Sequence, residues 1–407
     1  MLMRPSNLLV FITFCATVWL STSFASAQNS GAELHKMLRE KAAFNETDFA
    51  ALQQGQTVVK LLSVQDKSEV AVSGLVNLQV PAEVFLQSFR EGMLRKNDPA
   101  ILEIGSFSSQ PTLDDLKDLT FENRDLEDLK KCVVGNCQLK LSATMIDRLH
   151  KEVDWGAPDY NNQATQLLKL MLLDYVRDYL ARGDVALIEY NDKAEIVRLA
   201  EEQRALRASS GYLHDVLAKF SQYLIPFPES NLANVEHALI WSKVKFGLKP
   251  VITINHISIY KNDKAAGPQI LIASKQIYAN HYFDSSLALT AFVSIPGASP
   301  GGYLFYENRS RADGLEGMFG KLKRGIVEDR AVKALKSILE QSKVILNARA
   351  SSRTESEQPV AGARRWRRWR FGGVHLLWWL FLITASAALL AMSDYNWKRV
   401  VNGGAHE

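Results

Sequence analysis

The chain has 407 residues, 47% of them hydrophobic and 23% charged, which is the composition of a globular protein with its own core in one or two domains. Its formal charge of +4 comes from the two ends, because residues 1–27 hold one arginine, residues 364–407 carry about +5, and residues 28–363 carry about −2. A main body without excess positive charge argues against nucleic-acid binding, since that function needs a basic surface.

Residues 1–27 have the layout of a secretory signal. Arg4 gives a charged start, residues 8–20 are apolar, and Ala25, Ser26 and Ala27 form a small-residue cleavage site. An uncleaved signal anchor and a buried first helix are the alternatives. The pattern predicts that the following domain is exported.

Residues 28–347 are expected to form one α+β domain. Residues 68–80 alternate apolar and polar side chains, as a half-buried strand does, and Pro81 opens a helix. Residues 142–240 are mostly helical in pattern, with the widest apolar coverage at 161–181. We interpret 142–240 as a helical layer or insertion that packs on a sheet.

Two cysteines, Cys132 and Cys137, flank a short segment that contains a glycine. In an oxidising compartment this spacing favours a disulfide, with free thiols and redox or metal chemistry as alternatives. Haem attachment is excluded because Gln138, not histidine, follows the second cysteine, and a zinc site would need two further ligands. The sequence therefore predicts neither a metal nor a cofactor.

Residues 250–347 contain four extended segments followed by a long helix. The expected strands are Val251–Tyr260, Gln269–Phe283, Ser286–Ile295 and Tyr303–Arg309, and the expected helix runs from Gly314 to about Leu346. Short polar turns indicate antiparallel neighbours, and one amphipathic helix can cover a face of their sheet. The predicted fold class is α+β, with an antiparallel sheet wrapped on a long C-terminal helix, a helical insertion and a C-terminal transmembrane helix.

The segment Gln269–Phe283 is unusually polar for a strand, and two arginines follow it in the chain. An apolar pocket with a few polar anchors is the usual form of a small-molecule site. The candidate ligand-binding residues are Gln276, Tyr278, Asn280, Tyr282, Arg309 and Arg324. The alternative is a solvated face with salt bridges at the strand ends. His256 and His281 could transfer protons, but the spacing shows no partner for either, so no catalytic residue is predicted.

The C-terminal part has the pattern of a membrane anchor. Residues 348–370 are expected to be a linker, residues 371–392 carry no formal charge and could span a bilayer, and 393–407 would form a short tail. The basic cluster before the span is interpreted as a membrane-surface patch or as an ordinary flank of the span; its residues are Arg364, Arg365, Trp366, Arg367, Arg368, Trp369 and Arg370. The positive-inside rule prefers the opposite charge distribution. The prediction is a single-pass protein with a periplasmic or extracellular domain and membrane lipid as a partner.

The order of strand, helix, further strands and long C-terminal helix resembles the START-like helix-grip superfamily (SRPBCC type). The resemblance rests on residues 72–84 and 250–347, about a third of the chain, and the helical segment 142–240 departs from it. It implies binding of a lipid or other hydrophobic molecule and transfers no catalytic residue. The leading hypothesis is thus a membrane-anchored binding protein for a hydrophobic ligand. An envelope structural or protein-interaction domain and an uncharacterised enzyme are the alternatives.

Overall fold

The computed structural model describes residues 36–356 except 37, 41, 92–99, 212–219, 221–222, 225–226, 229–231, 233, 263–268, 295–300, 313–314 and 316–319, and it describes no side chains for 320–322 and 351–356. The predicted signal (1–27), the basic cluster (364–370), the predicted span (371–392) and the tail lie outside the described residues.

The predicted membrane anchor is corrected. Among the residues that the structure describes, no helix is long and apolar enough to cross a membrane. The longest described helix, α10 (Gly320–Ser356), carries charged side chains along its length. This finding contradicts the fold class as predicted, because that class included a transmembrane helix, and it contradicts the single-pass anchored localisation. The fold described is a mixed arrangement of helices around one large antiparallel sheet.

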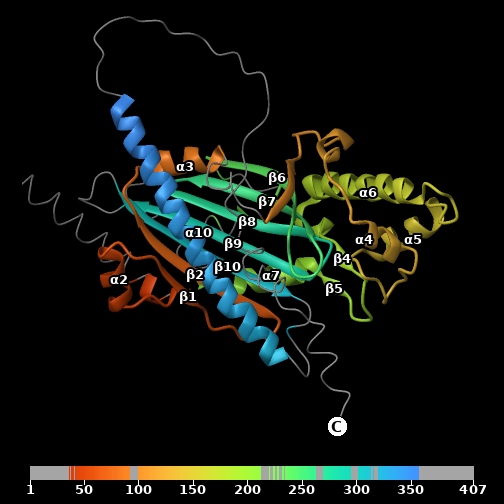
Figure 1. The fold of residues 1–407 in the computed structure, drawn as a ribbon, viewed down its shortest axis with the longest axis horizontal. Coiled ribbons are helices and arrows are strands. Elements are labelled where there is room, and N and C mark those ends of the chain that lie inside the picture. Colours follow the sequence, from red (N-terminus) through yellow and green to blue (C-terminus); the bar gives the residue numbers. More distant parts are fainter. Residues whose placement is uncertain are drawn as a thin grey trace, which may run out of the picture.

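Eight strands form this sheet in the order β1–β2–β10–β9–β8–β7–β6–β3, and every neighbouring pair is antiparallel (Figure 1). Their bounds are β1 Val58–Leu61, β2 Glu69–Leu78, β3 Ile101–Ser106, β6 Val235–Val244, β7 Val251–Lys261, β8 Ile270–Ala279, β9 Phe283–Ser294 and β10 Gly302–Ala312. The four strands predicted in 250–310 are confirmed, and β2 pairs with β10, so the segment at 68–80 completes the same sheet.

The helices lie on both sides of the sheet. Their bounds are α2 Glu46–Gln53, α3 Ala82–Arg90, α4 Asn123–Leu129, α5 Ala143–Glu152, α6 Tyr160–Arg182, α7 Leu199–Ser209 and α10 Gly320–Ser356, with short 3₁₀ turns at Leu113–Leu116 and Gly183–Ala186, and a small hairpin of β4 Glu189–Tyr190 and β5 Val197–Arg198. The helical prediction for 142–240 is wrong at its end, because β6 begins at Val235. Helix α10 continues past the predicted end at Leu346 into the predicted linker.

One face of the sheet, which we call the α10 face, is covered by α10 and α3. Helix α10 runs along β2: Arg324 bonds to the backbone carbonyl of Glu69, and Asn347 accepts from the backbone of Gln79. Leu335 and Leu339 lie over Gly74, where a Cβ would meet Leu339 Cδ1 at 2.5 Å. Figure 1 shows α10 lying across the sheet in front of β2.

The opposite face is covered by α2, α6 and α7. Phe44, just before α2, packs edge-on against Phe305 of β10, with ring centroids 6.4 Å apart. Tyr179 of α6 contacts His256 of β7, and Gln203 of α7 donates to the backbone of β8 and β9. Because both faces are covered, β2 is buried along nearly its whole length and not on one face as its alternation predicted.

Candidate functional site on the α10 face

The α10 face is mostly apolar, but a line of polar side chains crosses it from β7 to β10. Side chains alternate between faces along a strand, so residues two positions from a buried apolar residue share its face. Ile257, Ile272, Ala288 and Tyr306 belong to the cluster that packs with α10. The members of the line, which we call the polar row, follow from this alternation and from the strand register; they are Asn255, Gln276, Ser286, Asn308 and Ser310. All five are buried and none carries a formal charge.

The side chains at both ends of the polar row form hydrogen bonds within the protein. Asn255 donates to Thr253 Oγ1 at 3.0 Å. At the other end Ser286 and Ser310 share a hydrogen bond of 2.9 Å, and Asn308 bonds to both of these serines. Buried polar groups are normally paired in this way, because an unpaired one loses its water contacts without compensation.

Gln276 lies between these two groups and is different. It is 1% exposed, and neither its Nε2 nor its Oε1 has a hydrogen-bond partner among the described residues. Thr290, on the same face of β9, also has a buried hydroxyl without a described partner. Leaving one buried polar group unpaired costs about 1–3 kcal/mol. Such a group in a native fold is commonly met by a bound water or ligand, and Gln276 offers one donor and one acceptor side for this purpose.

Of the predicted ligand-binding residues, Tyr278 lies on the face opposite α10, while Asn280 and Tyr282 lie in the turn after β8, where Tyr282 packs beside the α10-face cluster. The sequence places Gln276, Tyr278, Asn280 and Tyr282 on one face by simple alternation. The register shifts between Ile254 and Asn255, however, so that Asn255 pairs with Gln276 and Ile254 with Tyr278. The extra residue of this bulge turns Tyr278 to the other face.

The structure gives each of those three residues a local partner. Tyr278 packs between the rings of Tyr175 and Tyr190 on the opposite face. Asn280 accepts from the Ile252 amide through Oδ1 at 2.7 Å. Tyr282 is in the β8–β9 turn, and its hydroxyl accepts from the Lys249 amide at 3.1 Å.

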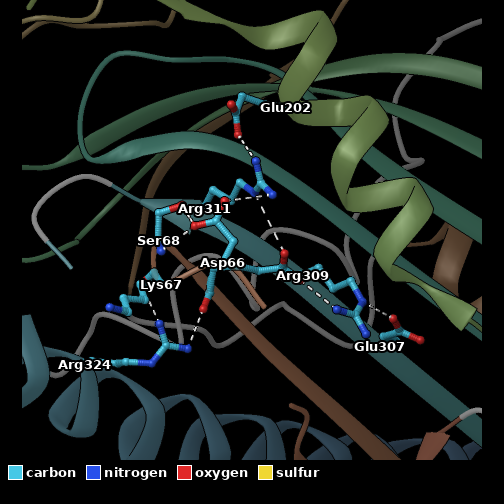
Figure 2. A network of polar contacts seen from close by, with 9 residues as sticks. Asp66, Lys67, Ser68, Glu202, Glu307, Arg309, Arg311 and Arg324 are labelled. Atoms are coloured by element: carbon cyan, nitrogen blue, oxygen red, sulfur yellow. Dashed lines mark hydrogen bonds and ion pairs between the residues drawn. The ribbon is translucent and has the colours of Figure 1, made fainter. Parts of the chain in front are cut away.

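The two predicted arginine anchors belong to an ion-pair network, shown in Figure 2. Arg309 is buried on the face opposite α10 and bonds to Glu307 at 2.6 Å and to Glu69 at 2.7 Å. Burial raises the pKa of Glu307, against the opposing effect of Arg309. Arg324 pairs with Glu328 at 2.7 Å and donates to backbone carbonyls at the start of β2. These contacts tie β2, β10 and α10 together, and a ligand contact by either arginine stays a prediction.

Sequence reasoning missed most of the polar row. Only Gln276 was named, whereas Asn255, Ser286, Asn308 and Ser310 were not. A signal was available, because Ser286 and Thr290 lie at even spacing on either side of Ala288, in the part of β9 that is otherwise apolar from Leu287 to Val293. Whether such a residue is paired depends on its neighbours across the sheet, and the strand register supplies them.

The predicted disulfide is confirmed. Cys132 and Cys137 are bonded, with their Cα atoms 4.4 Å apart, and they close a loop in which Val133 and Asn136 form a β-bridge. Within the described part of the chain, no group of three or more histidine, cysteine, aspartate or glutamate side chains could hold a metal ion.

Comparisons with known proteins do not assign a family. No family model matches the chain, and no curated protein matches it. Among solved structures, the Zhui aromatase/cyclase from Streptomyces sp. R1128 is similar at 15% identity, covering 37% of this chain and 90% of that chain, with a TM-score of 0.18. That structure has a helix-grip type of fold.

Proposed function

We propose that the protein binds a neutral hydrophobic molecule on the α10 face, with one polar group of the ligand meeting Gln276. The observation that carries this proposal is the buried Gln276 amide, which has no described partner on either side. Small-molecule sites are mostly apolar and contain a few placed polar groups. The polar row on an apolar sheet face has this character.

The charge of the site supports a neutral ligand. The polar row and Thr290 contain only amides and hydroxyls. The charged side chains of β10 in the Figure 2 network are on the opposite face; they are Glu307, Arg309 and Arg311. A charged head group buried there would lack a counter-ion, which is costly in an apolar setting. An alcohol, ketone or amide can exchange hydrogen bonds with Gln276 without this cost. The ligand class is therefore a hydrophobic molecule with an uncharged polar group.

The first test asks whether the protein carries or accepts such a molecule. The purified full-length chain is extracted with organic solvent, and the extract is analysed by mass spectrometry. The emptied protein is then titrated with a fluorescent apolar probe, which is displaced by dodecanol or by dodecanoate at pH 8. These two competitors have the same chain length and differ in head-group charge. We expect dodecanol to displace the probe at a concentration at least ten-fold lower.

The proposal fails if the extract contains no hydrophobic molecule and neither competitor displaces the probe. Equal or better displacement by dodecanoate would contradict the neutral-ligand assignment. Gln276→Leu is the variant that removes the proposed polar contact. Gln341→Leu is its matched control, because Gln341 is exposed on α10 and outside the polar row.

A further inference from the structure

A cleft of about 610 Å³ lies at the end of the sheet where the β6–β7 and β8–β9 turns meet the disulfide loop (residues 132–138). Helix α4 and the β4–β5 loop supply the remaining walls. The lining residues that matter for its chemistry are Arg124, Cys137, Lys140, Lys193, Lys249 and His281. The polar row does not contribute to this cleft, so it is separate from the site proposed above.

A chain of hydrogen-bonded side chains, from His281 through Asp125 to the half-buried Lys249, leads into the cleft. His281 Nε2 is 2.9 Å from Asp125 Oδ2, and Asp125 Oδ1 accepts from Lys249 Nζ at 2.8 Å. His281 is 5% exposed and Asp125 1%. Burial opposes ionisation of Asp125, but the contacts with His281 and Lys249 outweigh it and lower its pKa. Asp125 is therefore a carboxylate that holds the His281 ring by one nitrogen.

His281 has a second ring nitrogen, Nδ1, besides the one that contacts Asp125. No described residue forms a hydrogen bond with Nδ1, although the side chain is buried and lines the cavity. Lys249 uses two of its three ammonium hydrogens, on Asp125 and on Asp128 at 2.9 Å. Arg124 is exposed at the cleft wall, and no described carboxylate lies within ion-pair distance of it.

The carboxylates around the cleft are already engaged. Asp125 and Asp128 bind Lys249, and Asp284 binds Lys140 at 2.7 Å with Asp192 at 3.9 Å from the same ammonium. The carboxylates near the cleft are thus paired with lysines, whereas Arg124 has no carboxylate partner among the described residues. Besides the nitrogen that contacts Asp125, the His281 ring has a second nitrogen that can exchange a hydrogen bond with a ligand.

The walls of the cleft are held in place before any ligand arrives. Tyr282 has a φ of +59°, a conformation that costs a non-glycine residue about 1–3 kcal/mol. Its hydroxyl accepts from the Lys249 amide, which ties the β8–β9 turn to the β6–β7 turn. The disulfide fixes the opposite wall at Cys137. Rigid walls and unused donors are what an ion-binding site requires.

From this arrangement we propose a second site, in which the cleft binds a small oxyanion, either a carboxylate or a phosphate, between His281, Lys249 and Arg124. A planar guanidinium pairs with two oxygens of either anion at once, while the lysine and histidine each supply one donor. This inference does not depend on the proposed hydrophobic ligand.

The test uses the full-length protein at pH 6 and low salt, titrated by calorimetry with inorganic phosphate and, separately, with succinate. We expect saturable 1:1 binding of at least one anion, and the tighter of the two identifies the ligand class. Arg124→Gln should weaken that binding at least five-fold. Arg204→Gln is the control, because Arg204 is also exposed and lies on α7, outside the cleft.

Three results would overturn the proposal. They are no saturable binding of either anion, unchanged affinity in Arg124→Gln, and an equal loss in Arg204→Gln. A folded His281→Gln variant, checked by circular dichroism, should also lose affinity, and wild-type affinity in that variant would remove His281 from the site. Gln276→Leu should leave anion affinity unchanged, so this proposal and the hydrophobic-ligand proposal can fail independently.

Discussion

Gln276 and Asn255 are directly paired across β8 and β7, yet within the described residues only Asn255 has a hydrogen-bond partner for its amide. Two neighbouring amides on one sheet face thus differ in whether they have a hydrogen-bond partner. Asn255 is part of the packing, whereas Gln276 has donor and acceptor capacity to spare. This difference is the basis of the proposed ligand site, and it separates a binding group from a structural one.

The contact between α10 and β2 at Gly74 should tolerate no side chain. A Cβ there would meet Leu339 at 2.5 Å and Leu335 at 3.2 Å, and such overpacking costs about 1–3 kcal/mol. We expect Gly74→Ala to lower the free energy of urea-induced unfolding by that amount. Gly325→Ala is the control, because nothing lies within 4 Å of its Cβ and alanine favours a helix, so this variant should gain up to about 1 kcal/mol. Similar losses in both variants would contradict the described packing.

Breaking the Arg309 ion pairs should lower the free energy of unfolding. Arg309→Met leaves Glu69 and Glu307 buried near each other without their shared cation. Removing one partner of a buried pair costs about 3–5 kcal/mol, since the remaining charge is uncompensated. Arg204→Met, at an exposed position, should change unfolding by less than about 0.5 kcal/mol. If Arg309→Met unfolds at the same urea concentration as wild type, the network of Figure 2 does not stabilise the fold.

Because Lys275 is buried, we expect the free energy of unfolding to depend on pH in the alkaline range. Burial lowers its pKa to about 8, despite the attraction of Asp184. Between pH 8 and the unfolded value of 10.5, the unfolded chain binds more protons than the folded one. The contribution of Lys275 to the free energy of unfolding therefore rises with pH between 8 and 10.5. Lys275→Met removes the titration, so the unfolding free energy of wild type relative to this variant should increase from pH 8 to 10.5. A constant difference would show that Lys275 stays charged in the fold.

Several elements could be predicted from the sequence because their signals are local. Polar turns and alternating side chains located β7 to β10, and the alternation at 68–80 located β2. The cover on the second face of β2 was not predicted, because the alternation within β2 does not show that α2 and the residues before it pack there, where the Ala42 carbonyl accepts from Ser73. The end of the helical segment was also misplaced, although Leu239 and Trp241 of β6 share one face at strand spacing.

The candidate site was harder to predict for a physical reason. One extra residue in β8 turns Tyr278 away from Gln276, and the spacing of polar residues does not reveal a bulge. The roles of Arg309 and Arg324 depend on Glu69, far away in the sequence. The Asp125–His281 contact also joins residues far apart in the sequence, since 156 positions separate them. The disulfide could be predicted from the sequence because both cysteines lie in one short loop.

The central claim is that Gln276 is left unpaired for a ligand, and one variant tests it directly. Gln276→Leu is compared with wild type in urea unfolding without ligand and in dodecanol displacement of the apolar probe. Removing an unpaired buried amide should raise the free energy of unfolding by about 1–2 kcal/mol, while loss of the ligand contact should weaken dodecanol binding about ten-fold. A variant that is less stable than wild type and binds dodecanol equally well would contradict the account.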